Sequence, residues 1–281
     1  MMKVSVVVLL LLAGSLAASA AFSGGRMGGT SFRSSSRTRS SSYHHSRSTP
    51  SPSSYHSTPS TIVIGWPTII ILFAICFVII LRYVIAMTTS VVKLQVGLLG
   101  MATSLQKDLN QIAHIADTST PKGFTYILRE TALSVLQHHD YCNSAYSSVE
   151  LKMGVEECEK LFNKLSKEER VKVHEETLVN FNNIKKQSAT THEEVSHGAC
   201  NQYIVVTIIV AARGVHELQP IRSSEHLKIA LKKLASIPSK DVLAAEVLWT
   251  PQKENDVFTE QEMLEGYPLL RSHFWDYFHI F

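Results

Sequence analysis

Two short stretches of the sequence concentrate side chains that could do chemistry. The first, HEEVSHGAC, holds imidazole, carboxylate and thiol groups of the kinds that bind zinc, at His192, Glu193, His197 and Cys200. His192 and His197 are five residues apart, so on a helix they would face in different directions. A polar loop before a strand is the simpler interpretation, and a metal site is the less favoured one.

The second stretch, QHHDYC, begins at Gln137. Asp140 could orient His139 as a general base, but adjacent residues on a helix face apart. A histidine near a helix C-terminus, where the helix dipole favours positive charge, is the simpler interpretation. The sequence contains no GxSxG elbow, P-loop, HExxH motif or Rossmann glycine pattern after a strand. We therefore expect a protein that is not an enzyme, with no catalytic, metal or cofactor-binding residues and no cofactor.

Charge is distributed unevenly along the 281 residues. The first acidic residue is Asp108, and nine of the 27 Lys and Arg residues precede it, which leaves 18 basic against 24 acidic residues in the remainder. The net charge of +3 is therefore the sum of a basic N-terminal part and a mildly acidic domain. Residues 108–281 do not offer a generally basic nucleic-acid-binding face, and we expect no nucleic acid as a partner.

The N-terminus has the pattern of a secretory leader. MMKVSVVVLLLLAGSLAASAAF has one basic residue, an apolar run and small residues around Ala20, which is the order that a signal peptidase recognises. We expect residues 1–20 to be a signal-like leader cleaved after Ala20. An uncleaved anchor is the alternative.

A second apolar segment, IVIGWPTIIILFAICFVIIL, covers Ile62–Leu81. Its length matches the roughly 20 residues that a helix needs to cross a bilayer, and it contains no charge before Arg82. Trp66 and Tyr83 flank the run as interfacial aromatic residues do. The pattern predicts a transmembrane helix with flanks over residues 61–87, in preference to a buried core helix.

Residues 21–60 are rich in Gly, Ser, Arg, Pro and His and contain no acidic residue. This composition predicts a disordered linker, and the segment GGRMGG within it is interpreted as spacer because no strand precedes it. An RNA-binding Arg/Ser tract and an organelle transit peptide are alternatives. A location beyond the membrane argues against the first, and transit peptides lie at the very N-terminus, which argues against the second.

The charges beside the apolar segment predict its orientation. Arg82 and Lys93 follow it closely, so the positive-inside rule places residues 88–281 in the cytoplasm or its organellar equivalent and residues 21–60 on the other side. The cysteines at positions 142, 158 and 200 are irregularly spaced and fit free thiols in a reducing compartment.

The sequence over residues 88–271 predicts a globular domain, and the apolar stripe from Leu98 to Ala116 marks an amphipathic helix. This stripe must be covered by the domain's own sheet or by a partner, and we expect the domain's own sheet to cover it. A second helix should begin at Pro121, after a Thr-Ser-Thr cap, with Thr131 among its inner residues. The further expected elements are a strand over 146–151, a helix over 155–165, a helix from the Ser166–Glu169 capping box to about 187, a central strand over 203–212, a helix over 225–235 and a strand over 242–250.

The last three of these elements suggest a right-handed β-α-β unit. The fold class is therefore α/β or α+β, a small sheet with a helical layer. Doublets of glutamate, such as Glu168-Glu169, are interpreted as the solvated faces of helices.

Several stretches also resemble a known family. GGRMGG before a Ser-rich tract, VVKLQVGLLGMATSLQKDLNQIAHIADTSTPKG, YCNSAYSSVELK, EETLVNFNNIKKQS, YIVVTIIVAA, LKKLASIPS and EVLWTPQKENDVFTEQEMLEGYPLLR follow one another as in the fluctuating-light acclimation protein family of plants and cyanobacteria, over residues 24–271. The resemblance implies a chloroplast membrane protein that helps adjust photoprotective energy dissipation (non-photochemical quenching) and the thylakoid proton gradient when light changes. The family's domain has no known biochemical activity, so the resemblance implies no site residues.

Two departures from the family accompany the resemblance. Plant members carry a transit peptide upstream of the apolar leader, whereas this sequence starts with the leader; either a first exon is missing or the protein goes to another membrane. The ending SHFWDYFHIF adds an aromatic C-terminal extension over residues 272–281.

Three functional hypotheses follow. The leading one is a single-pass, membrane-anchored, non-enzymatic regulator whose stromal domain binds a transporter or other protein of the thylakoid or envelope membrane. The others are a secretory-pathway adaptor and a membrane-tethered, metal-dependent enzyme of unknown reaction.

Overall fold

The structure is a computed structural model that describes residues 22–32, 65–188, 203–253, 256 and 258–270. The chain divides into two units, one of residues 1–32 with 87–281 and the other of residues 33–86. The leader of residues 1–20, the linker from residue 33 onwards and the extension over 272–281 lie outside the described residues.

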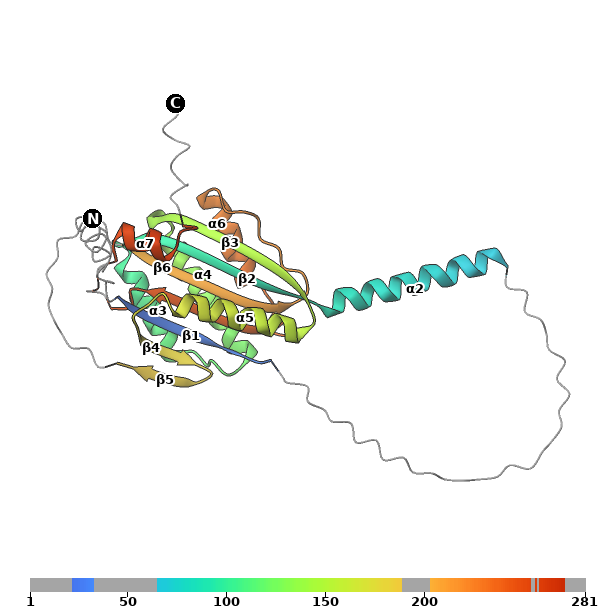
Figure 1. Cartoon of the computed structure of the whole chain (residues 1–281), viewed down its shortest axis with the longest axis horizontal. Helices are drawn as coiled ribbons and strands as arrows, with labels where there is room; N and C mark the ends of the chain where they lie inside the picture. The colour runs from blue at the N-terminus through green and yellow to red at the C-terminus, as the bar shows by residue number, and fades with distance from the viewer. Residues whose placement is uncertain (1–21, 33–64, 189–202, 254–255, 257, 271–281) are drawn as a thin grey trace, which may run out of the picture. The chain divides into compact units, whose positions relative to one another are not determined.

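The first unit is built on a sheet of seven described strands (Figure 1). Their order across the sheet is β3-β2-β6-β7-β1-β4-β5. Only β1 and β4 run parallel, and all other neighbours are antiparallel. The bounds are β1 Ser23–Thr30, β2 Thr88–Leu99, β3 Cys142–Met153, β4 Glu175–Phe181, β5 Ile184–Gln187, β6 Tyr203–Arg213 and β7 Val242–Thr250.

Helices cover both faces of this sheet (Figure 1). One face carries α3 (Thr103–Ile115), α4 (Pro121–Gln137) and α6 (Ser224–Ala235), while α5 (Val155–Arg170) packs on the other. The short helix α7 (Glu260–Gly266) packs against β6. The predicted combination of a sheet and helices is confirmed, with a larger sheet and a second helical layer.

β6 is an interior strand of the sheet, as its continuous β-branched run predicts. It lies between β2 and β7, and its residues from Tyr203 to Ala212 are buried. Such a strand needs apolar side chains on both faces because both faces are covered by helices.

The segment GGRMGG is strand β1, so the prediction of a spacer is wrong for residues 23–30. β1 lies inside the sheet, where Met27 pairs with Val247 of β7 and with Asn180 of β4. Glycine is needed here because a Cβ on Gly25 would lie 2.0 Å from the Trp249 ring. Gly28 has φ +144, which residues with side chains rarely adopt.

The apolar stripe after the second apolar segment belongs to two elements rather than one helix. β2 ends at Leu99, and α3 begins at Thr103. The helical part is correct, because Leu105 and Leu109 of α3 are completely buried in the main core. The expectation that the domain covers this stripe itself is confirmed.

Helix α4 begins where the sequence predicts. The Thr120 hydroxyl accepts a hydrogen bond from the Gly123 amide at 3.2 Å, and Pro121 occupies the first turn. Its inner face is buried, including Thr131. The strand expected over 146–151 is also confirmed as part of β3.

Two predictions between residues 166 and 250 are wrong. The Ser166–Glu169 capping box starts no helix, because α5 continues to Arg170 and is followed by the hairpin of β4 and β5. The helix α6 and the strand β7 lie as predicted, but β6 and β7 pair antiparallel and form no right-handed β-α-β unit. The Arg213 amide donates to the Asp241 carbonyl at 2.8 Å, so the α6 excursion leaves and returns at one end of the sheet.

The described part of the second unit is dominated by α2 (Trp66–Met87). Its large apolar side chains are exposed, among them those of Trp66, Phe73 and Phe77. No helix among the described residues combines the length and the apolar character needed to cross a membrane. The transmembrane helix expected over residues 61–87 is therefore not supported by the structure.

Candidate functional site

The structure places His139 and Asp140 in a short turn after α4. The His139 Nε2 lies 3.1 Å from an Asp140 carboxylate oxygen, so the two side chains do meet. The other ring nitrogen lies 3.0 Å from the Leu136 carbonyl, at the end of α4. The imidazole thus sits beside a helix C-terminus, which agrees with the simpler interpretation of this stretch.

The four candidate ligands of HEEVSHGAC, from His192 to Cys200, lie outside the described residues. Within the described ranges, no three His, Cys, Asp or Glu side chains are placed to hold a metal ion. Burial, followed by the nearby Asp140 charge, raises the pKa of the Cys142 thiol to about 12. Burial also raises the pKa of Cys158. Both thiols are therefore protonated near neutral pH and are weak nucleophiles.

A buried charge cluster lies between the sheet and α5, centred on Glu169. Its carboxylate is 2.6 Å from the Lys93 Nζ and 2.9 Å from the Lys172 Nζ, and it accepts a hydrogen bond from the Gln95 amide at 3.0 Å. The prediction that the Glu168-Glu169 doublet is solvated is wrong for Glu169, which is buried. Because Glu169 belongs to α5 and both Lys93 and Gln95 belong to β2, the cluster fastens α5 to β2.

Lys172 is the outer member of this cluster. Its Nζ lies 4.2 Å from the centre of the Tyr267 ring. Burial lowers the pKa of Lys172, and the Glu169 charge partly opposes this. Burial also raises the pKa of Tyr267. These contacts connect α5 with the chain after α7.

A second buried ion pair joins β1 to β7. The Arg26 Nε donates a hydrogen bond to the Glu246 carboxylate, and both side chains are buried. The Arg26 guanidinium also lies 3.7 Å from the centre of the Phe181 ring in β4. Arg26 thus connects three strands, which fits a role in holding the sheet together.

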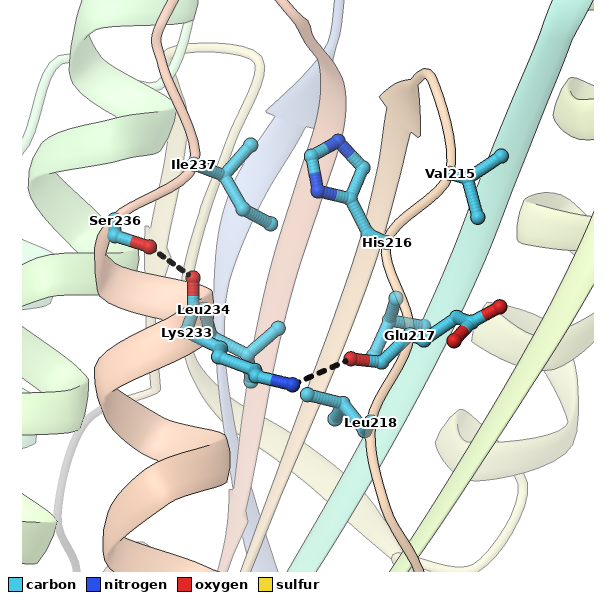
Figure 2. Close-up of a pocket in the computed structure, with 9 residues that line it drawn as sticks. Val215, His216, Glu217, Leu218, Lys233, Leu234, Ser236 and Ile237 are labelled. Atoms are coloured by element: carbon cyan, nitrogen blue, oxygen red, sulfur yellow. Dashed lines mark hydrogen bonds between the residues drawn. The ribbon is translucent and has the colours of Figure 1, made fainter. Parts of the chain in front are cut away.

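An open pocket of about 420 Å³ lies between the chain after β6 and the end of α6 (Figure 2). Val92, Leu218 and Ile237 give it an apolar lining, and His216 and Lys233 contribute polar groups. His216 Nε2 lies 2.9 Å from the Arg213 carbonyl, and the Lys233 Nζ donates to the Glu217 carbonyl at 3.4 Å. One ring nitrogen of His216 and the Lys233 amine are thus each engaged by a backbone carbonyl.

Helix α2 offers a different kind of site. It contains no charged residue from Trp66 to Leu81, and consecutive exposed residues such as Ile71, Leu72 and Phe73 point in different directions around its axis. A helix that is apolar on all sides must be covered by other apolar material. α2 is therefore a candidate interaction element among the described residues.

Comparisons with known proteins address the first unit. Residues 88–273 match a family described as "Protein of unknown function (DUF1517)". The chain belongs to the DUF1517 family. The match begins at Thr88, the first residue of β2, so β1 and α2 precede the part that the DUF1517 match covers.

Two curated relatives are similar to this DUF1517 chain. One, from Arabidopsis thaliana, is named "FLUCTUATING-LIGHT-ACCLIMATION protein 1, chloroplastic" and is 56% identical over 65% of this chain and 46% of its own length. The other, from Synechocystis, is named "Protein FLAP1 homolog A" and is 39% identical over 64% of this chain and 56% of its own length. The chain thus spans about half the length of the curated relatives it matches, and no solved structure matches it.

These comparisons confirm the resemblance to the fluctuating-light acclimation family. The structure adds residues of the DUF1517 chain that sequence reasoning missed, above all Arg26, Glu169 and Glu246. A signal was present for two of them. Glu246 is a lone charge in the apolar run VLAAEVLWT, and Arg26 is a lone charge among glycines. A charged residue in such surroundings is buried only when it is paired.

Proposed function

We propose that the protein is a membrane-associated, non-enzymatic regulator of photoprotection in the chloroplast. It acts during acclimation to fluctuating light, on non-photochemical quenching and the thylakoid proton gradient. Its first unit binds a membrane protein or transporter of the thylakoid or envelope. The names of the Arabidopsis and Synechocystis relatives support the process, and the word chloroplastic in the first name supports the compartment.

The observation that carries the membrane association is the exposure of α2. Among the described residues, large apolar side chains of its uncharged stretch from Trp66 to Leu81 are exposed, and Met87 passes directly into β2 of the DUF1517 match. Lipid covers such a helix on all sides at once, whereas a groove on a protein covers one stripe.

The non-enzymatic role is supported by how the buried charges are used. Glu169 is shared by two lysines and an amide, and Arg26 is held by Glu246 and Phe181. An active site needs a base or nucleophile that can meet a substrate. These groups instead bind one another, which suits a rigid scaffold for a partner.

Complementation tests this proposal. The full chain, expressed in a plant that lacks the Arabidopsis relative, should be found in chloroplast membranes and restore quenching under fluctuating light. A triple variant of α2, Phe73→Asn, Phe77→Asn and Ile80→Asn, should move to the soluble fraction and fail to restore it. The matched control places Leu133→Asn on the exposed face of α4 and should behave as the wild type. Restoration by the triple variant from the soluble fraction would contradict the proposal.

A secretory-pathway adaptor is the second candidate, because the signal-like residues 1–20 favour it. A fluorescent fusion at the C-terminus separates the two, since label in the endoplasmic reticulum and not in chloroplasts would favour the adaptor. A stoichiometric metal in the purified full chain, measured by elemental analysis, would favour the metal-dependent enzyme.

A further inference from the structure

The chain leaves the sheet after β1 and returns to it in β2 at the same end (Figure 1). The register shows this step by step. Thr30 pairs with Ala244 of β7. Ala244 pairs with Ala211 of β6, and Ala211 pairs with Val91 of β2. The last residue of β1 is therefore level with the beginning of β2.

Residues 31–87 are consequently one excursion from one end of the sheet. Because β1 and β2 belong to the same sheet, residues 23–30, 88–188 and 203–250 lie on the same side of any membrane. The predicted orientation, with residues 21–60 opposite residues 88–281, is wrong for residues 23–30. If α2 crossed the bilayer, residues 33–60 would have to cross it as well so that β1 and β2 could join one sheet. Such a crossing would bring four arginines into the hydrocarbon region, which is costly.

Exposed apolar side chains gather at this end of the sheet. Met87 is 42% exposed, Leu151 49%, Met153 60% and Val215 49%. We call these four residues the β2-start rim.

Backbone contacts hold the β2-start rim together around Thr88, the first residue of β2. Thr88 pairs with Met153. The Gly154 amide donates to the Met87 carbonyl and the Gly214 amide to the Thr88 carbonyl, each at 2.8 Å. Met87, Met153 and Val215 therefore lie on chain segments that meet at one point.

We propose that the β2-start rim rests on the lipid of a bilayer and that α2 enters the bilayer from that same side. This rests on the proposed membrane association. The rim is continuous with α2 through Met87, and the exposure of α2 on all sides suits lipid as the occupant. The strands of the sheet are then all attached to one face of the membrane.

Labelling of single cysteines tests the one-sided arrangement. The full chain with Cys76→Ser and Cys200→Ser is bound to phosphatidylcholine vesicles and treated with a membrane-impermeant maleimide. Ser31→Cys, just after β1, and Lys164→Cys, on α5, should be labelled to the same extent in intact vesicles. If one of them reacts only after detergent is added, the two strands lie on opposite sides and the inference is wrong.

Substitutions of two valines test whether the β2-start rim contacts lipid. Val215→Glu in the rim should weaken binding to phosphatidylcholine vesicles at least tenfold. Val171→Glu follows the far end of α5, where valine is 73% exposed, and should leave binding unchanged. Unchanged melting temperatures show that both variants are folded.

The outcomes separate the two proposals. If the wild-type chain does not bind vesicles, the proposed membrane association fails and this inference fails with it. If the wild type binds and both valine variants bind equally well, only this inference fails. If Val215→Glu instead abolishes a dimer in sedimentation and leaves vesicle binding intact, a second copy of the chain covers the rim and lipid does not.

Discussion

The Arg26 guanidinium and the Glu246 carboxylate form a buried ion pair between residues 220 positions apart in the sequence. Arg26 belongs to β1, which the chain forms before α2, and Glu246 belongs to β7 in the DUF1517 match. The pair therefore makes the glycine-rich segment before α2 a structural part of the family domain.

Replacement of Arg26 should destabilise the whole first unit. Arg26→Met leaves the Glu246 carboxylate buried without its cation, and removing one partner of a buried pair costs about 3–5 kcal/mol. Urea unfolding of the full chain in detergent, followed by tryptophan fluorescence, measures the loss. Arg129→Met, on the exposed side of α4, is the control and should change the unfolding free energy by less than about 0.5 kcal/mol.

A double variant separates the lost charge pairing from lost packing. Adding Glu246→Leu to Arg26→Met removes the unpaired charge and should recover part of the stability. A double variant as unstable as the sum of the two single changes would show that the two side chains do not interact.

Substitution of Glu169 tests the charge cluster, and the same substitution of its neighbour Glu168 is the matched control. Glu169→Gln removes the negative charge shared by Lys93 and Lys172, so those partly buried cations repel each other without compensation. We expect a loss of about 3–5 kcal/mol in unfolding free energy. Glu168→Gln, at an exposed position, should cost less than about 0.5 kcal/mol. Equal effects of the two variants would mean that the cluster is not buried.

Asp117 makes stability depend on acid pH. The hydrogen bonds from Ser119, followed by that from Thr120, lower the pKa of Asp117 from 3.8 to about 2. The folded state thus binds this proton more weakly than the unfolded chain does, so the stabilisation is present above pH 4 and is lost as pH falls from about 4 to about 2. Unfolding measured across this window should show a smaller decrease for Asp117→Asn and for Ser119→Ala than for the wild type. A decrease identical to that of the wild type in both variants would refute this assignment.

Leu109 tests whether α3 is held by the domain itself. The side chain is fully buried in the main core, and Leu109→Ala should cost about 2–5 kcal/mol. Leu133→Ala, on α4 where the leucine is 47% exposed, should cost much less. If Leu109→Ala keeps the wild-type melting temperature but loses co-purifying membrane proteins, the stripe on α3 is a docking surface instead.

The parts of the fold that were predictable from the sequence have strong local signals. The run from Tyr203 to Ala212 is apolar without interruption, which indicates a strand covered on both faces. Thr120 and Pro121 supply the cap and first turn of α4. The end of β2 was harder to predict, because the helical spacing of Leu98, Leu105 and Leu109 hides the alternation of residues 93–98 in the strand.

The parts that were missed depend on contacts between distant residues. β1 has almost no side-chain pattern, because glycine is required where Trp249 and the β7 backbone approach closely. Glu169 resembles a surface residue in sequence, and only the folded sheet brings Lys93 to it. The hairpin of β4 and β5 turns at Asn182 and Asn183, both with positive φ, and a spurious capping box obscured it.

Hydrogen–deuterium exchange over residues 23–30 tests most directly whether β1 belongs to the sheet. The full chain is kept in detergent, and mass spectrometry follows the peptide that covers GGRMGG beside one from β6. Because β1 is hydrogen-bonded to both β7 and β4, its amides should exchange about as slowly as those of β6. Exchange at the rate of an unstructured peptide would contradict the shared sheet and the one-sided membrane attachment inferred from it.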